Sequence, residues 1–268
     1  MERCLGLMAG AGILPGRAAA EARRQGWRVV AFAFADAPDL ASAADRVVPS
    51  QVTDLQSVLG ALGPEGVGAV AFVGSFAKRR FFAHAEQADD AGRDLSREGL
   101  ADGSLGRMAV ALLGSMGIEV MDQRRLLGPW LVASERLSTR APSEAEWTEI
   151  HEGWRLAHDL ANRGVGQTVV RARGVTVAVE AAEGTDEAIR RGVRLSGPGA
   201  VVVKAVADDH DFRFDIPTIG LATLETMEAG GASALAVARG RTLVVDHEAV
   251  ARRADAAGIA LVTLEDSA

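Results

Sequence analysis

Charged and aromatic side chains alternate late in the chain, in a pattern that suits phosphate chemistry. The segment Asp211–Asp215 has the sequence Asp-Phe-Arg-Phe-Asp, and Pro217–Gly220 follows it. If the segment is extended, Asp211, Arg213 and Asp215 share one face and the two phenylalanines lie on the other. Arginine pairs with phosphate oxygens, whereas carboxylates hold a metal ion or activate water. We therefore expect a site for a phosphorylated substrate here; an edge strand with surface charges is the alternative.

A second set of carboxylates lies directly after a β-rich run. Its members are Glu180, Glu183 and Asp186, and Gly184 marks a turn among them. Grouped oxygen ligands suit Mg²⁺, which is commonly held by one or two carboxylates together with substrate phosphate. Lys204, further along the chain, is a candidate clamp for phosphate oxygens. A strand exit followed by a capped helix would account for the same residues.

A glycine-rich turn lies between the first predicted strand and the first predicted helix. Gly10 and Gly12 belong to the run Gly-Ala-Gly-Ile-Leu-Pro-Gly. Glycines let the backbone approach an anion, and a helix N-terminus favours negative charge. The dinucleotide fingerprint needs a third glycine where this chain has Pro15, so we expect a phosphate or nucleotide site rather than an NAD site. A tight turn that needs small residues is the alternative.

Three consecutive cations follow another predicted strand, at Lys78, Arg79 and Arg80. Ligands of open α/β sheets bind at the carboxyl ends of the strands. These cations are therefore placed to face a diphosphate, unless they form only a solvated helix start.

The elements that must position these residues alternate between strand and helix in the N-terminal half. Continuous apolar runs that alternate with helical patterns are typical of a parallel sheet covered on both faces. We therefore predict an α/β fold with a Rossmann-like N-terminal domain. Its expected strands are 4–9, 27–34, 67–74 and 118–121, and its expected helices are about 15–25, 54–62 and 105–116.

The C-terminal half is predicted to be a mixed α/β domain. Ser143 and Glu146 have the spacing of a capping box, which predicts a helix to about Arg163. Two β-rich runs joined at Arg173-Gly174 predict a hairpin. The domain boundary falls near residues 125 to 142, and we place the domains at 1–135 and 136–268. Expected strands are 168–172, 175–181, 201–205, 234–238, 242–245 and 259–264, with helices at about 185–192, 221–229 and 247–257.

Composition excludes several classes of protein. Of the 268 residues, 48% are hydrophobic, which provides enough apolar material for a core and excludes a disordered chain. Acidic residues outnumber basic ones by 36 to 29, which argues against a nucleic-acid partner. The lone Cys4 can form neither a disulfide framework nor a cysteine-based zinc site. We expect a cytoplasmic protein with at most peripheral membrane contact, because no apolar run reaches the roughly 20 residues of a spanning helix.

Several of these segments together resemble the LpxI family of UDP-2,3-diacylglucosamine pyrophosphatases. The resemblance is collinear from about residue 4 to residue 264. The E-G-T-D and D-x-R-x-D-x-P-T-I-G patterns are specific in combination. The matching segments are Leu5–Pro15, Ala141–Trp147, Gly166-Gln167, Glu180–Asp186, Asp211–Gly220 and Gly240–Asp246.

The resemblance implies a Rossmann-like domain followed by a C-terminal domain particular to the family, with the substrate held between them. It implies Mg²⁺-dependent hydrolysis of UDP-2,3-diacylglucosamine to UMP and 2,3-diacylglucosamine 1-phosphate in lipid A synthesis. The essential aspartate of the family falls on Asp215, and the last acid of E-G-T-D falls on Asp186; we expect both to hold the metal, with Asp211 as a third catalytic carboxylate. The expected substrate-binding residues are Gly10, Gly12, Lys78, Gln167, Thr185, Lys204, Arg213 and Thr218.

One departure from the family pattern motivates an alternative. Members usually have a K-P-x-Q-D approach to the D-x-R-x-D motif, whereas this chain has Ala-Asp-Asp-His-Asp at residues 207–211, which lacks the cation, the proline and the glutamine. The chain would then be a divergent member that hydrolyses or only binds another nucleotide diphosphate. A nicotinamide-dependent oxidoreductase is a further alternative that only the Rossmann-like start supports. Each of these predictions implies a small nucleotide ligand as the partner. For the leading prediction this ligand is a nucleotide-sugar lipid, which the protein would meet at the inner membrane surface. The sequence leaves a homo-oligomer open as an alternative to a monomer.

Overall fold

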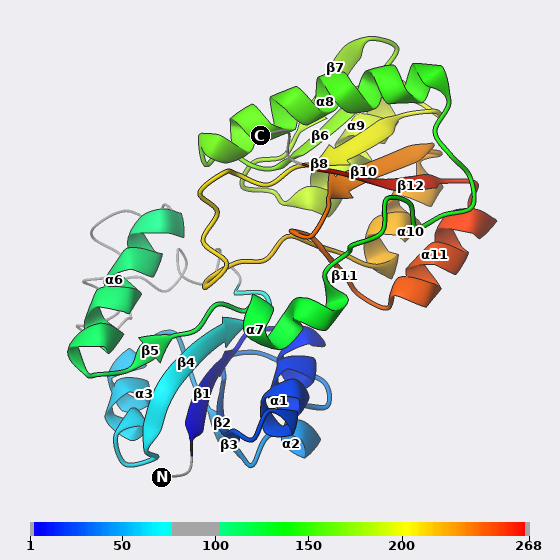
Figure 1. The fold of residues 1–268 in the computed structure, drawn as a ribbon. Coiled ribbons are helices and arrows are strands. Elements are labelled where there is room, and N and C mark those ends of the chain that lie inside the picture. Colours follow the sequence, from blue (N-terminus) through cyan, green and yellow to red (C-terminus); the bar gives the residue numbers. More distant parts are fainter. Residues whose placement is uncertain (1–2, 77–101, 266–268) are drawn as a thin grey trace. The chain divides into compact units, whose positions relative to one another are not determined.

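The structure is a computed structural model that describes residues 3–76 and 102–265. The chain forms two compact units (Figure 1). The first comprises Met1–Pro129 together with Asp211–Asp215, and the second comprises Trp130–His210 and Ile216–Ala268. No helix in the described residues is long and apolar enough to cross a membrane.

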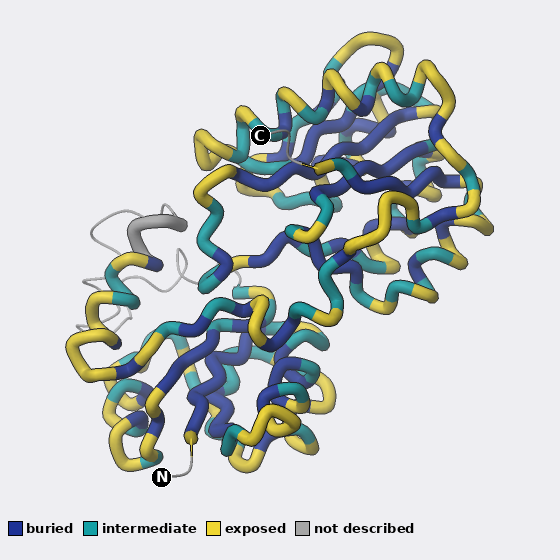
Figure 2. Tube along the Cα trace, viewed as in Figure 1, coloured by how far each residue is buried: buried dark blue, intermediate teal, exposed yellow. Residues whose placement is uncertain are grey.

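The first unit contains the parallel sheet that the N-terminal pattern predicted, and its strand order is β3-β2-β1-β4-β5. Its central strands are buried because they are apolar on both faces and helices cover each face (Figure 2). The strands are β1 (Cys4–Ala9), β2 (Arg28–Ala33), β3 (Arg46–Pro49), β4 (Val67–Val73) and β5 (Glu119–Val120). The helices are α1 (Leu14–Arg24), α2 (Leu40–Ala43), α3 (Leu55–Leu62), α6 (Asp102–Ser115), α7 (Arg124–Leu127) and the 3₁₀ turn Gly128–Trp130.

The sequence pattern did not predict β3 or α2. Both are only four residues long, and β3 is an edge strand with exposed ends, so neither has a continuous apolar run. The strand order has a functional consequence. The chain winds outwards from β1 to β3 and then returns to β4 on the other side of β1, so that β1 and β4 flank a topological switch point. Ligands of such sheets bind beyond the carboxyl ends of those two strands.

The second unit is built on a mixed sheet, as predicted for the C-terminal half, and its strand order is β12-β10-β8-β6-β7. Strands β8, β10 and β12 are parallel, whereas β6 runs against β8 and forms the predicted hairpin with β7. A separate pair, β9 and β11, is parallel. The strands are β6 (Thr168–Ala172), β7 (Val175–Val179), β8 (Val201–Lys204), β9 (Thr218–Ile219), β10 (Ala234–Ala238), β11 (Leu243–Val244) and β12 (Ala260–Leu264). The helices are α8 (Glu144–Asn162), α9 (Thr185–Ser196), α10 (Leu221–Ala229) and α11 (His247–Ala256).

Helices cover both faces of this sheet. Val201 and Val203 pack with α8 on one face, and Val202 packs with α9, α10 and α11 on the other. Two helix glycines permit the close approach: a Cβ atom on Gly153 of α8 would lie 2.9 Å from Val203, and one on Gly192 of α9 would lie 2.7 Å from Val170. Because side chains alternate between the two faces of a strand, a residue two positions from Val170 or Val202 also faces α9.

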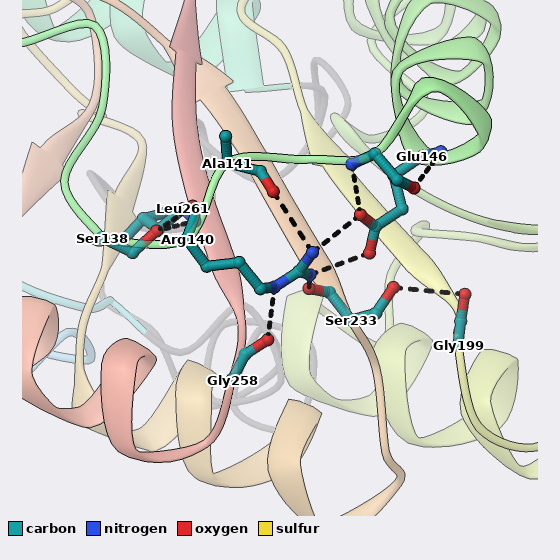
Figure 3. Close-up of polar contacts among 9 residues, drawn as sticks. Ser138, Arg140, Ala141, Glu146, Gly199, Ser233, Gly258 and Leu261 are labelled. Atoms are coloured by element: carbon teal, nitrogen blue, oxygen red, sulfur yellow. Dashed lines mark hydrogen bonds and ion pairs between the residues drawn. The ribbon is translucent and has the colours of Figure 1, made fainter.

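The start of α8 is stabilised by the predicted capping box and by an arginine (Figure 3). The backbone N–H of Ser143 donates to Glu146 at 2.7 Å, and the backbone N–H of Glu146 donates to the Ser143 hydroxyl at 3.3 Å. Arg140 donates to both carboxylate oxygens of Glu146, at 2.8 and 2.9 Å, and to the backbone oxygens of Gly258 and Ser233. The arginine thus connects the start of α8 to the loops that lead into β12 and β10.

This arrangement predicts acid sensitivity of the second unit. The hydrogen bonds from Arg140 lower the pKa of Glu146 from 4.5 to about 2. A lowered folded-state pKa stabilises the protein fully above pH 4.5, and the contribution is lost as the pH falls towards 2. We expect Glu146→Gln to lower the free energy of unfolding by about 2 kcal/mol at pH 7 and to flatten its decrease between pH 4.5 and 2.

Urea unfolding followed by circular dichroism at several pH values measures this effect. The matched control is Glu144→Gln, which neutralises an exposed carboxylate in the same first turn. Equal pH profiles for the two variants would contradict the prediction.

Candidate functional site

The first candidate region lies at the switch point of the first unit, where the loops after β1 and β4 are bonded to each other. The Ala11 N–H donates to the Ser75 oxygen and the Ser75 N–H donates to the Ala11 oxygen, both at 2.9 Å. A Cβ atom on Gly10 would lie 2.7 Å from the Ser75 oxygen, and one on Gly74 would lie 2.8 Å from the Ala11 oxygen. These two glycines are therefore required by the contact between the loops.

The same hydrogen bonds limit what the glycine turn can offer to an anion. The Gly10 N–H donates to Val73 and the Gly12 N–H donates to Asp36, at 2.8 and 3.1 Å. The amides of residues 10 to 12 are thus engaged within the protein. Gly12 has a φ of +99°, and none of the described residues has an atom within 4 Å of the place of a Cβ atom there. A ligand can therefore approach the bare backbone at Gly12, but it would not find a free amide there. The predicted cations Lys78, Arg79 and Arg80 lie outside the described residues.

The segment Asp211–Asp215 is a turn, so the extended conformation that would place Asp211, Arg213 and Asp215 on one face is not present. The Phe214 N–H donates to the Asp211 oxygen at 3.2 Å, which closes the turn. The Asp211 carboxylate accepts hydrogen bonds from the Arg213 backbone at 3.1 Å and from its guanidinium at 2.7 and 2.8 Å. This pairing raises the pKa of Arg213. Local carboxylate–backbone bonds of this kind compete with a strand, and here they prevail. Asp215 follows the turn and is exposed.

The turn contacts residues of the first unit that the sequence did not indicate as candidate site residues. The Gln123 N–H donates to the Phe212 oxygen at 3.0 Å, and the Arg124 guanidinium lies 4.0 Å from the centre of the Phe212 ring. The Phe214 ring lies 5.3 Å from the ring of Phe72 on β4. Their position in the sequence could have indicated these residues. Residues 122 to 124 follow β5, the last strand of the sheet along the chain, and therefore lie at its carboxyl edge.

The second candidate region lies at one edge of the sheet in the second unit. Thr168 opens β6 and is paired with Lys204, which ends β8, and Glu180 follows the end of β7. The Glu180 N–H donates to the Thr168 oxygen at 2.8 Å. By strand parity all three side chains stand on the face that α9 covers. They are at most 8% exposed, so a charged pair and a hydroxyl are buried together.

Thr185, the first residue of α9, links this buried pair. Lys204 Nζ donates to the Thr185 hydroxyl at 2.8 Å, and that hydroxyl donates to Glu180 Oε1 at 2.9 Å. The direction is determined because an ammonium cannot accept and an ionised carboxylate cannot donate. Glu180 therefore orients the Thr185 hydroxyl, and the hydroxyl orients Lys204. The sequence predicted Thr185 and Lys204 as binding residues and Glu180 as one of three carboxylates suited to Mg²⁺, but it did not predict that Glu180 orients Thr185.

Two buried oxygens of this cluster, Glu180 Oε2 and Thr168 Oγ1, have no hydrogen-bond partner among the residues that the structure describes. Buried polar atoms are normally satisfied, so these two atoms are the ones in the cluster that can still form a hydrogen bond. The neighbouring backbone is close: a Cβ atom on Gly166 would lie 2.1 Å from the Glu180 oxygen, which requires glycine before Gln167. The Gln167 oxygen in turn accepts from the Ala205 N–H at 3.0 Å.

The acids of the E-G-T-D motif have different surroundings. Glu183 pairs with Arg191 at 2.5 Å, and a bond from its own backbone together with that arginine lowers its pKa. Asp186 lies in the first turn of α9, is half-buried, and its carboxylate has no hydrogen bond or ion pair with the described residues. Thr218 is the first residue of β9, and its hydroxyl donates to the Ile216 oxygen at 2.8 Å.

The oxygen atoms of these side chains are suitable ligands for Mg²⁺, but the described side chains do not form a complete metal site. Among the described residues no three potential ligand side chains cluster. Mg²⁺ usually takes only one or two carboxylates, with phosphate oxygens and water completing its shell. Asp186 is available as such a ligand, whereas both oxygens of Asp211 are bonded to Arg213. Asp186 belongs to the second unit and Asp215 to the first, so that their predicted convergence stays a prediction.

Comparison with known proteins identifies relatives of the whole chain. Residues 4–130 match the family model described as the LpxI N-terminal domain, and residues 133–262 match the LpxI C-terminal domain. The chain is also similar to UDP-2,3-diacylglucosamine pyrophosphatase LpxI of Caulobacter vibrioides. The two are 31% identical over a match that covers 96% of each chain.

Proposed function

The chain belongs to the LpxI family, and we propose that it hydrolyses the diphosphate of UDP-2,3-diacylglucosamine to UMP and 2,3-diacylglucosamine 1-phosphate. The observation that carries this proposal is the collinear similarity, over 96% of both chains, to a relative named for that substrate. The proposal places the chain in lipid A synthesis.

The reaction adds water across a phosphoanhydride. The water oxygen bonds to one phosphorus, the bridging P–O bond breaks, and the proton of the water passes to a base. Such a reaction needs charge neutralisation on the phosphates, an aligned nucleophile and a stabilised leaving phosphate. We assign the base or water-positioning role to Asp215, and the binding of phosphate oxygens to Lys204 and Arg213. The open backbone at Gly12 suits the close approach of the nucleotide half.

We propose further that Asp186 and Asp215 hold a Mg²⁺ ion, which would neutralise phosphate charge when bound. The unpaired, half-buried carboxylate of Asp186 supports this assignment, as does the oxygen-only chemistry of the two side chains. For Asp211, the pairing with Arg213 supports an orienting role towards that arginine rather than direct metal ligation.

Assay of the purified protein with UDP-2,3-diacylglucosamine tests the proposal. We expect UMP release that stops when EDTA is added and returns with excess MgCl₂, because the diphosphate charge is then neutralised again. UMP and the lipid product are separated by chromatography. Persistence of full activity in EDTA would refute the metal assignment. Release of UMP from other UDP-sugars but not from the diacyl substrate would instead favour a divergent specificity.

A further inference from the structure

We propose that Arg124 is a positioning residue that holds the segment Asp211–Asp215 on the first unit, and thereby holds Asp215 in place for the reaction. The catalytic consequence rests on the proposed function, whereas the docking itself does not. The chain enters this segment from His210 and leaves it to Ile216, both of which belong to the second unit. Chain continuity therefore does not hold the segment on the first unit, and contacts with residues distant in sequence must do so.

Arg124 is itself held rigidly by Asp122. Its Nε lies 3.0 and 3.1 Å from the two carboxylate oxygens, its Nη2 donates at 2.6 Å, and its backbone N–H donates at 2.8 Å. Burial raises the pKa of Asp122, but the hydrogen bonds from Arg124 outweigh burial and lower it. The carboxylate is consequently ionised near neutral pH, and the planar guanidinium is confined to one orientation.

That orientation places the guanidinium over the Phe212 ring. Its central carbon lies 4.0 Å from the ring centre, within the range of a cation–π contact. Phe212 is 5% exposed, and the adjacent Gln123 N–H donates to its backbone oxygen at 3.0 Å. The Arg124 guanidinium and the Gln123 amide thus both hold Phe212, and both belong to the short stretch of chain that follows β5.

The second aromatic residue of the turn is also seated on the first unit. Phe214 lies against Phe72 of β4, and a Cβ atom on Gly106 of α6 would lie only 2.6 Å from the Phe214 ring. Phe212 and Phe214 are therefore two anchors on either side of Arg213. Asp215 follows the second anchor directly, so a loosened anchor moves its carboxylate.

The matched pair Arg124→Ala and Arg125→Ala tests the docking. Arg125 is the adjacent arginine, and its guanidinium donates to Glu119 at 2.9 Å. Hydrogen–deuterium exchange of peptides that contain residues 211–215 is the primary measurement. We expect exchange at least about fivefold faster in Arg124→Ala and within twofold of wild type in Arg125→Ala, with intermediate exchange in Arg124→Lys. Peptides from β1 and β4 report whether the unit stays folded.

Steady-state kinetics gives the second measurement. A displacement of about 1 Å at a reacting group can cost roughly a hundredfold in rate. We expect kcat to fall about 10- to 100-fold in Arg124→Ala while KM changes less than threefold, and Arg125→Ala to retain wild-type values. If Arg124→Ala unfolds β1 and β4, Phe212→Leu, which keeps an apolar anchor but removes the ring, replaces it in both measurements.

Unchanged exchange at residues 211–215 would overturn the docking role. Faster exchange with an unchanged kcat would overturn the claim that docking serves catalysis. An inactive wild-type protein would instead refute the proposed function, and the exchange result alone would then decide the role of Arg124.

Discussion

Asp215→Asn is expected to reduce UMP release at least about a thousandfold while leaving the fold intact. The substitution preserves the size of the side chain but removes its charge, its basicity and most of its affinity for a cation. General-base catalysis alone contributes about 10²- to 10⁴-fold, and loss of a metal ligand adds to that effect. Asp215 is exposed, so the change removes no buried charge. Initial rates with saturating Mg²⁺, together with the circular dichroism spectrum, measure both parts of the prediction.

The matched control is Asp209→Asn. Asp209 is an exposed carboxylate in the loop before the turn, and nothing assigns it a role in the reaction. We expect this variant to retain wild-type activity. If Asp215→Asn keeps more than a third of the wild-type rate, the assignment of this carboxylate is wrong.

Lys204→Met is expected to lower kcat/KM about a hundredfold. Methionine retains the apolar stem but removes the ammonium. A hydrogen bond to a charged group contributes about 1.5–3 kcal/mol, which corresponds to a factor of roughly 10 to 150. Lys204 is 5% exposed, so its charge acts in surroundings that screen it weakly. The melting temperature is expected to fall as well, because the buried Glu180 carboxylate loses its nearby counter-charge, so rates are compared at a temperature at which circular dichroism shows the variant to be folded.

Thr185→Val is the informative control for this prediction. It removes the hydroxyl between Lys204 and Glu180 but leaves both charges in place. We expect a loss of about tenfold, because the ammonium is then present but no longer oriented. Activity of Lys204→Met equal to that of the wild type would exclude Lys204 from phosphate binding.

Local patterns predicted most of the fold correctly. Strand β1 and the hairpin at Arg173-Gly174 have continuous apolar runs and turn glycines, and the capping box at Ser143 depends on residues only three positions apart. These signals act within a few residues, so tertiary packing reinforces them and does not overturn them. Helix α9 extended four residues beyond its predicted end, since Gly192 did not stop it but packed against Val170.

The alternation at Asp211–Asp215 was misleading for the same reason that it was conspicuous. Alternating charge and aromatic residues satisfy a strand, but they equally satisfy a turn whose two rings are received by a separate surface. Nothing within the five residues specifies that surface. It is formed by Arg124, Phe72 and Gly106, which lie between about 90 and 140 positions earlier in the chain.

The sequence by itself thus determined the element types, the two sheet classes and the family, because each depends on residue patterns that are read along the chain. Only the tertiary structure decided which groups share an environment: that Gly10 accommodates the loop after β4, that Glu180 orients Thr185, and that the acidic turn is held by Arg124. The physical reason is that burial and hydrogen-bond partnership depend on distances through space, and residues far apart in sequence supply the partners.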